Sequence, residues 1–168
     1  MKDGAIIISN HTHIFDYYVF VYKHLFHVVH TMVADIVYKI KCLTTLNKIM
    51  GNIKVESHDS SNYIAISKTK ELLLKKKTVL IFPEGRLEDK KGEIMDFKPS
   101  AILLAWETNK PIIPYYINGK YSFFSRVHLI AGEKIYLREI FKKEAINDED
   151  IKEMVNYGKD FGVELIPC

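Results

Sequence analysis

Cysteine is scarce in this chain of 168 residues, which contains only Cys42 and Cys168. Two thiols without a spaced pattern cannot form a disulfide framework or a four-thiolate metal site. The chain also lacks the roughly 18 consecutive apolar residues that a membrane-spanning helix needs. Its first apolar run, Ala5–Ile8, is too short for the hydrophobic region of a signal peptide. These absences predict a protein of the reducing cytosol.

Arginine is also rare, since it supplies only three of the 24 basic residues. The net charge is 24 − 21 = +3, but it is unevenly distributed. Residues 139–168 hold four lysines and eight acidic residues, a balance of −4, so residues 1–138 carry +7. This excess favours an anionic ligand or an anionic membrane surface. The lysines are scattered and no RNA-binding signature occurs, so nucleic acid is not a predicted partner.

The chain has no internal repeat and no linker rich in proline and glycine, and its length fits one domain. Apolar runs predict strands at 5–8, 78–82 and 112–117, with weaker candidates at 28–33, 53–55, 127–131 and 134–137. Helical patterns cover 13–26, 35–50, 60–76, 99–108 and 148–159. Because the strong strands are apolar throughout, their sheet should be covered on both faces. The alternation predicts a single α/β domain with a mixed, mostly parallel central sheet flanked by helices.

The first motif that suggests chemistry is Ser9–Asp16, directly after the first apolar strand. Loops at the carboxyl ends of strands often carry functional groups in α/β sheets. If this loop curls back, Asp16 can orient the imidazole of His11 and stabilise its protonated form. Such a pair acts as a general base. The alternative is a polar loop residue followed by a helix cap.

The second motif is Phe82–Arg86, which also follows an apolar strand. Pro83 ends the strand, Gly85 permits a tight turn, and Arg86 is presented from that turn. The neighbouring carboxylate of Glu84 and guanidinium of Arg86 suit a hydroxylated, phosphorylated ligand. The alternative is a surface turn with an internal ion pair.

Together these motifs resemble the glycerolipid acyltransferase family, best known through the lysophosphatidate acyltransferases. The family's first block is Asn-His, four residues and Asp, which Asn10, His11 and Asp16 match. Its third block reads Phe-Pro-Glu-Gly and then Thr-Arg, which is similar to Phe82–Arg86 except that the threonine is missing. The resemblance extends over residues 6–137 in the family's order.

Two further blocks add to the resemblance: residues 97–101 match a Phe-Lys-x-Gly/Ser-Ala segment, and Pro111 and Pro114 match a Pro-Ile-x-Pro strand. The family's second block normally carries an arginine that is missing here, so Lys54 or Lys68 is expected to replace it in binding phosphate. Most members carry a helical segment before the first block. The chain is therefore expected to be a single acyltransferase domain over 1–168 that lacks this segment.

The resemblance implies transfer of a fatty acyl group from acyl-CoA or acyl carrier protein to a lysophospholipid such as lysophosphatidate, in phospholipid biosynthesis. It makes His11 the base and Asp16 its orienting acid, with Glu84, Gly85 and Arg86 positioning the acceptor. No metal or other cofactor is implied, and no covalent intermediate, since the chain lacks a Gly-x-Ser-x-Gly elbow. The implied location is cytoplasmic and peripheral, on the inner face of the membrane.

Two other interpretations stay open. One is a lipid-binding module without catalytic competence. The other is a metal-dependent hydrolase, because His11 and His13 form a His-x-His pair with Asp16 nearby. Its further ligands would be His24, His27, His30 and His128.

Aromatic residues follow the histidine motif closely, and the sequence leaves their role open between core packing and lining the path of an acyl chain. They are Phe15, Tyr17, Tyr18, Phe20 and Tyr22.

Overall fold

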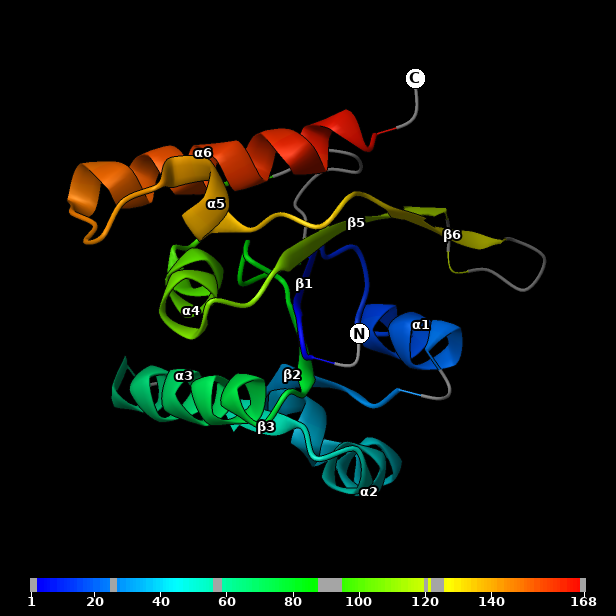
Figure 1. Ribbon diagram of the computed structural model, residues 1–168. Coiled ribbons are helices and arrows are strands. Elements are labelled where there is room, and N and C mark those ends of the chain that lie inside the picture. Colours follow the sequence, from blue (N-terminus) through cyan, green and yellow to red (C-terminus); the bar gives the residue numbers. More distant parts are fainter. Residues whose placement is uncertain are drawn as a thin grey trace.

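The computed structural model describes residues 3–24, 27–55, 59–87, 95–119, 121 and 126–166 (Figure 1). The helices and strands follow one another as β1 (Ile6–Ser9), α1 (Asp16–Lys23), β2 (Val29–Ala34), the 3₁₀ helix η1 (Asp35–Lys39), α2 (Lys41–Ile49), β3 (Ile53–Val55), α3 (Asp59–Leu74), β4 (Thr78–Ile81), α4 (Ser100–Thr108), β5 (Ile112–Gly119), β6 (Val127–Ala131), α5 (Leu137–Phe141) and α6 (Asp148–Glu164).

The strands form one six-stranded sheet in the order β3-β2-β4-β1-β5-β6. Every neighbouring pair is parallel except β5 and β6, which are antiparallel. β1 lies inside the sheet, with β4 on one side and β5 on the other. The predicted α/β domain with a mixed, mostly parallel sheet is confirmed.

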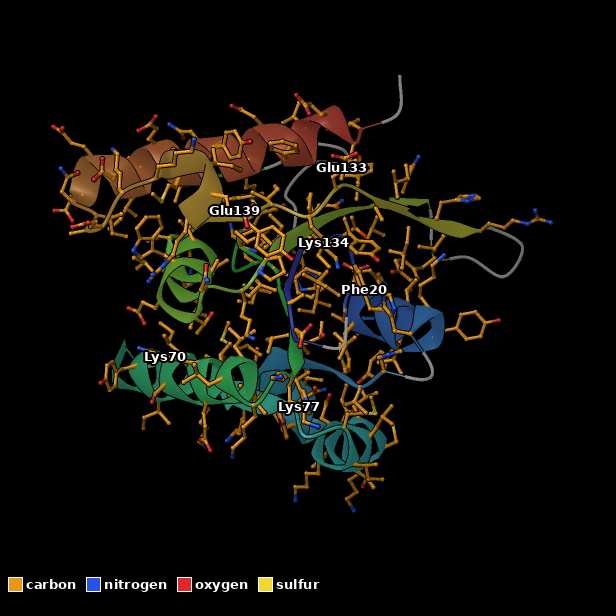
Figure 2. The ribbon with its side chains drawn as sticks, viewed as in Figure 1. Phe20, Lys70, Lys77, Glu133, Lys134 and Glu139 are labelled. Atoms are coloured by element: carbon orange, nitrogen blue, oxygen red, sulfur yellow. The ribbon has the colours of Figure 1, made fainter. Side chains whose placement is uncertain are left out.

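Helices cover both faces of this sheet, and the side chains of β1 divide between the two cores (Figure 1). Ile6 and Ile8 pack on one side with buried residues of α3, α4 and α6, including Met154. Ile7 packs on the other side with residues of α1, including Phe20 (Figure 2). Successive side chains of a strand point to opposite faces, so a strand buried on both sides must be apolar throughout.

The helices differ from the predicted ones at their ends. The first begins at Asp16 rather than at residue 13, because the preceding residues form the loop that Asp16 holds. The predicted helix 35–50 is divided at Ile40, whose backbone is extended. The last helix continues to Glu164 and starts from a capping box between Asn147 and Asp150. Within the described residues, none of the helices combines the length and the apolar character that crossing a bilayer requires.

The predicted strand 134–137 is wrong. Only Ile135 pairs there, in an isolated antiparallel bridge to Ile112, and α5 begins at Leu137. Pro114 lies within β5 rather than at an edge of the sheet. The carbonyl of Pro114 accepts a hydrogen bond from the N–H of Gly132, just beyond the end of β6. Proline has no N–H to donate in return, and it lies where the pairing between β5 and β6 ends.

Candidate active site

The two sequence motifs meet at the carboxyl edge of the sheet because β1 and β4 are parallel neighbours. Ile8 pairs with Ile81, so the chain leaves the two strands side by side. The ring of His11 stacks on the ring of Phe82, with centroids 4.1 Å apart and planes inclined by 17°. Strand pairing thus joins two motifs that are far apart in the sequence.

Asp16 lies at the centre of this site and is fully buried. Its Oδ2 is 2.9 Å from Nδ1 of His11. The same oxygen accepts hydrogen bonds from the backbone N–H groups of Thr12, at 2.7 Å, and His13, at 2.8 Å. One carboxylate oxygen therefore both folds the loop after β1 and orients the imidazole.

The other oxygen of Asp16 accepts two hydroxyl groups, from Thr12 at 3.1 Å and from Tyr121 at 2.5 Å. Burial alone would raise the pKa of Asp16. Hydrogen bonds from His11, Tyr121 and the N–H of His13 outweigh burial, so that the pKa lies below its ordinary value. Asp16 is therefore ionised at neutral pH.

This geometry suits His11 to accept a proton. An ionised carboxylate is an acceptor only, so Nδ1 of His11 carries its proton towards Asp16 and Nε2 keeps a lone pair. The side chain of His11 is 22% exposed, in contrast to that of Asp16 at 0%. Stacking on Phe82 and bonding to Asp16 fix the ring in two directions. The pair can act as a general base towards a group that reaches this edge of the sheet.

Asn10 holds the start of the loop against β5. Its side-chain amide donates to the carbonyl of Ile117 at 3.1 Å, and its Oδ1 accepts the N–H of Ile117 at 2.7 Å. The side chain takes the place of a paired strand residue where the backbone of β1 turns away. The asparagine is thus a structural member of the motif.

The turn after β4 combines buried and exposed residues. Pro83 and Glu84 are buried, whereas Gly85 and Arg86 are exposed. Gly85 has a φ of +71°, which glycine adopts at little cost, and its N–H donates to the carbonyl of Phe82 at 3.0 Å. The turn therefore presents Arg86 on the surface, whereas Glu84 is buried.

Lys98 also belongs to this turn, although sequence analysis did not propose it as a site residue. Its N–H donates to the carbonyl of Pro83 at 2.8 Å. A Cβ placed on Gly85 would lie 2.7 Å from Nζ of Lys98, so the lysine side chain covers this glycine. The signal was present in the Phe97-Lys98 block, but spacing alone does not show that this block folds back onto the turn.

The structure does not gather the other predicted cations at the same place. Lys54 is exposed on β3, which is an edge strand separated from β1 by β2 and β4. Lys68 is exposed on α3. Pro111 precedes β5, where its carbonyl accepts the N–H of Ile6 at 2.9 Å, so its role is in the sheet.

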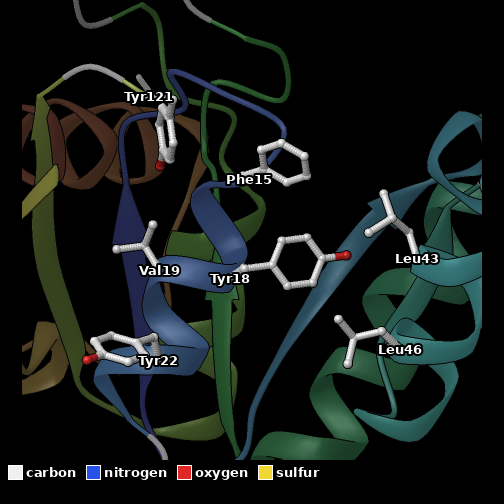
Figure 3. Close-up of a pocket in the computed structure, with 7 residues that line it drawn as sticks. All are labelled: Phe15, Tyr18, Val19, Tyr22, Leu43, Leu46 and Tyr121. Atoms are coloured by element: carbon white, nitrogen blue, oxygen red, sulfur yellow. The ribbon is translucent and has the colours of Figure 1, made fainter. Parts of the chain in front are cut away.

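An apolar groove lies between α1 and α2 beside the loop of Asp16 (Figure 3). Its volume is about 530 Å³, within the range of pockets that hold small ligands. It is lined by Phe15, Tyr18, Val19, Tyr22, Leu43, Leu46 and Tyr121.

The groove divides the aromatic residues whose role the sequence left open. Tyr17 and Phe20 are buried in the core. Phe15, Tyr18 and Tyr22 line the groove instead. α1 therefore presents one aromatic face to the sheet and another to the groove.

The histidines proposed for a metal site are spread over the molecule. His24 approaches Tyr115, with Nε2 and the hydroxyl 3.5 Å apart, and His30 contacts the carbonyl of Gly51 at 3.1 Å. His128 lies on β6. Within the part of the chain that the structure describes, no three His, Cys, Asp or Glu side chains form a group able to hold a metal ion.

The lowered pKa of Asp16 leads to a prediction about acid unfolding. A carboxyl with a lower pKa in the folded state stabilises the fold above its unfolded pKa, and this contribution is lost as pH falls through the folded value. We expect the difference in free energy of unfolding between the native chain and Asp16→Asn to be present at about pH 5 and to shrink below about pH 4. Urea denaturation at each pH measures it. A difference that does not shrink in acid would contradict the assignment.

Comparison with known proteins finds a matching family model and matching solved structures. A family model described as Acyltransferase matches residues 1–118. The fold is similar to the crystal structure of the 1-acyl-sn-glycerophosphate (LPA) acyltransferase PlsC from Thermotoga maritima, with a TM-score of 0.68 and 19% sequence identity. The similarity covers 96% of this chain but 65% of that chain. No curated protein sequence matches the chain.

Proposed function

As the chain belongs to the acyltransferase family, we propose that it is an O-acyltransferase that moves a fatty acyl group from a thioester donor, acyl-CoA or acyl carrier protein, to the hydroxyl of a lysophospholipid. The observation that carries this proposal is the contact between His11 and Asp16 beside the Phe82–Arg86 turn. The similar structure of PlsC, named for 1-acyl-sn-glycerophosphate, supports lysophosphatidate as the acceptor and a place in phospholipid biosynthesis.

In the proposed reaction, Nε2 of His11 takes the proton of the acceptor hydroxyl while its oxygen attacks the carbonyl carbon of the thioester. Asp16 stabilises the imidazolium that forms. The carbon–sulfur bond of the tetrahedral intermediate then breaks, and the departing sulfur takes the proton from Nε2. The products are an ester and a thiol, and the reaction needs no resident cofactor or metal.

The acceptor is proposed to bind at the Phe82–Arg86 turn. Arg86 is exposed there, and Lys98 covers Gly85, so two cations lie at the turn next to the ring on which His11 stacks. A guanidinium and an ammonium suit a phosphate group. Glu84 and Gly85 position the glycerol part of the acceptor.

The acyl chain is proposed to lie in the groove between α1 and α2. The groove is walled by aromatic and leucine side chains and begins at Phe15, one residue before Asp16. An alkyl chain placed there would leave its carbonyl carbon near the loop that carries His11.

Membrane attachment is proposed to be peripheral, at the cytoplasmic face. The proposed acceptor and product reside in lipid, and the +7 charge of residues 1–138 attracts anionic headgroups.

A radiolabelled acyl-transfer assay across lysolipids with and without a terminal phosphate tests this function. We expect transfer by the native chain, and a loss in Arg86→Ala of roughly tenfold or more that is confined to phosphate-bearing acceptors, because such a charge-assisted contact contributes about 1.5–3 kcal/mol. Lys75→Ala is the matched control, since it removes one exposed positive charge just before β4, at the opposite edge of the sheet. Equal loss with phosphate-free acceptors would contradict the role of Arg86. Lipid binding without any transfer would contradict the proposed function.

A further inference from the structure

Tyr121 belongs both to the apolar groove and to the hydrogen-bond network of Asp16. Its hydroxyl donates to Oδ1 of Asp16 at 2.5 Å. Its ring lines the groove together with Phe15 and Val19 (Figure 3). The ring also stacks on that of His13, with centroids 4.5 Å apart. The same side chain thus touches the place proposed for the acyl chain and the acid that orients the proposed base.

The contacts of Asp16 are divided between its two oxygens. Oδ2 contacts Nδ1 of His11 and accepts hydrogen bonds from two backbone N–H groups of the loop. Oδ1 accepts hydrogen bonds from the hydroxyl groups of Tyr121 and Thr12. A donor on Oδ1 draws negative charge away from Oδ2. The carboxylate then stabilises a protonated His11 less strongly than it would without that donor.

The phenol keeps its proton throughout the relevant pH range. Burial, with the hydrogen bond to Asp16 and the charge of that residue, raises the pKa of Tyr121 well above its ordinary value. Its hydroxyl is therefore a donor to Asp16 and never a second anion beside it. Among the described residues, the other titratable or charged groups at this edge of the sheet are His11 and His13 from the loop, Glu84 and Arg86 from the turn after β4, and Lys98, whose side chain covers Gly85.

From this geometry we infer that Tyr121 is a positioning residue that sets the basicity of His11 through Asp16 while its ring forms part of the acyl-binding wall. The inference rests on the proposed function for the identity of the chain in the groove. The two roles of Tyr121 can be tested separately, because its hydroxyl affects His11 through Asp16 and its ring contacts the ligand in the groove.

Tyr121→Phe tests the role of the hydroxyl, since it removes that group and keeps the ring. We expect the acidic limb of the kcat/KM profile to move to higher pH by about 0.5 unit, the size of shift that one hydrogen bond to a charged partner can produce. The rate on that limb then falls about threefold, while the alkaline plateau and the KM for the acyl donor stay near the native values. Tyr121→Ala also removes the ring, so it should raise the KM for the donor as well.

Thr12→Val is a second, independent variant, because it removes the other hydroxyl donor to Oδ1 without touching the groove. We expect it to shift the acidic limb in the same direction and to leave the donor KM unchanged. Tyr63→Phe is the control, since Tyr63 is a tyrosine 78% exposed on α3. It should change neither quantity.

A measurement without substrate separates this inference from the proposed function. The ring signals of His11 in nuclear magnetic resonance spectra, assigned by their loss in His11→Gln, report its titration directly. We expect the midpoint to rise in Tyr121→Phe and in Thr12→Val. Unchanged midpoints in both variants would overturn the inference whether or not the native chain transfers acyl groups. If the midpoints rise while the native chain transfers no acyl group, the coupling stands and the proposed function fails.

Discussion

His11→Ala is expected to lower the turnover number for acyl transfer by at least about 10²–10⁴-fold, the usual contribution of a general base. The variant leaves no group to take the proton of the acceptor hydroxyl. The KM for the acyl donor should change little, because the imidazole is not part of the groove. Steady-state rates with saturating donor and acceptor measure both quantities.

The fold should survive this change. The His11 side chain is partly exposed, and Asp16 keeps the donors of Thr12, His13 and Tyr121 when the imidazole is lost. Circular dichroism and the thermal unfolding midpoint verify this. His128→Ala, an exposed histidine on β6, is the matched control and should turn over as the native chain does. Turnover of His11→Ala within tenfold of the native rate would rule out its assignment as the base.

Asp16→Asn is expected to reduce turnover about 10²–10⁴-fold and also to destabilise the fold by about 1–3 kcal/mol. The amide retains one acceptor oxygen, which can still receive the backbone N–H groups of the loop. It carries no charge, so an imidazolium at His11 loses its stabilising partner. The NH₂ group of the asparagine takes the position of Oδ1, which accepts the hydroxyls of Thr12 and Tyr121 in the native chain. Because NH₂ is a donor, both hydroxyls must rotate to accept from it.

Turnover and urea denaturation of the same preparation measure the two effects of Asp16→Asn. Asp96→Asn is the control, because Asp96 is an exposed carboxylate paired with Lys159. It should leave both turnover and the unfolding midpoint unchanged. If Asp16→Asn kept native turnover, the proposed mechanism would be wrong even if the fold were weakened.

The sheet could be predicted from the sequence because burial on both faces requires strands that are apolar throughout. Residues 5–8, 78–82 and 112–117 carry this signal directly. The ends of the helices could not be predicted as well, because they depend on tertiary contacts. The loop before α1 is fixed by the carboxylate of Asp16, and this contact shortens a helix that the apolar pattern alone extends to residue 13.

The candidate site was only partly visible in the sequence. The spacing of His11 and Asp16 predicts a pair because a short loop can close it locally. Lys98 and Tyr121 depend on segments that return to the site from other parts of the chain. Nothing in the spacing of Tyr121 indicates that its hydroxyl reaches Asp16, so this contact required the structure.

The position of β1 in the sheet has a consequence for how the chain folds. This strand precedes the other five along the chain, yet its partners Val79 and Ile112 follow only much later. During synthesis its isoleucines must therefore stay unpaired until β4, about 70 residues later in the chain, has been made. Contacts between residues so far apart in the sequence slow folding and prolong the exposure of unpaired strand edges, which promote aggregation. We expect refolding yields that fall with rising protein concentration and recover when a chaperone is supplied.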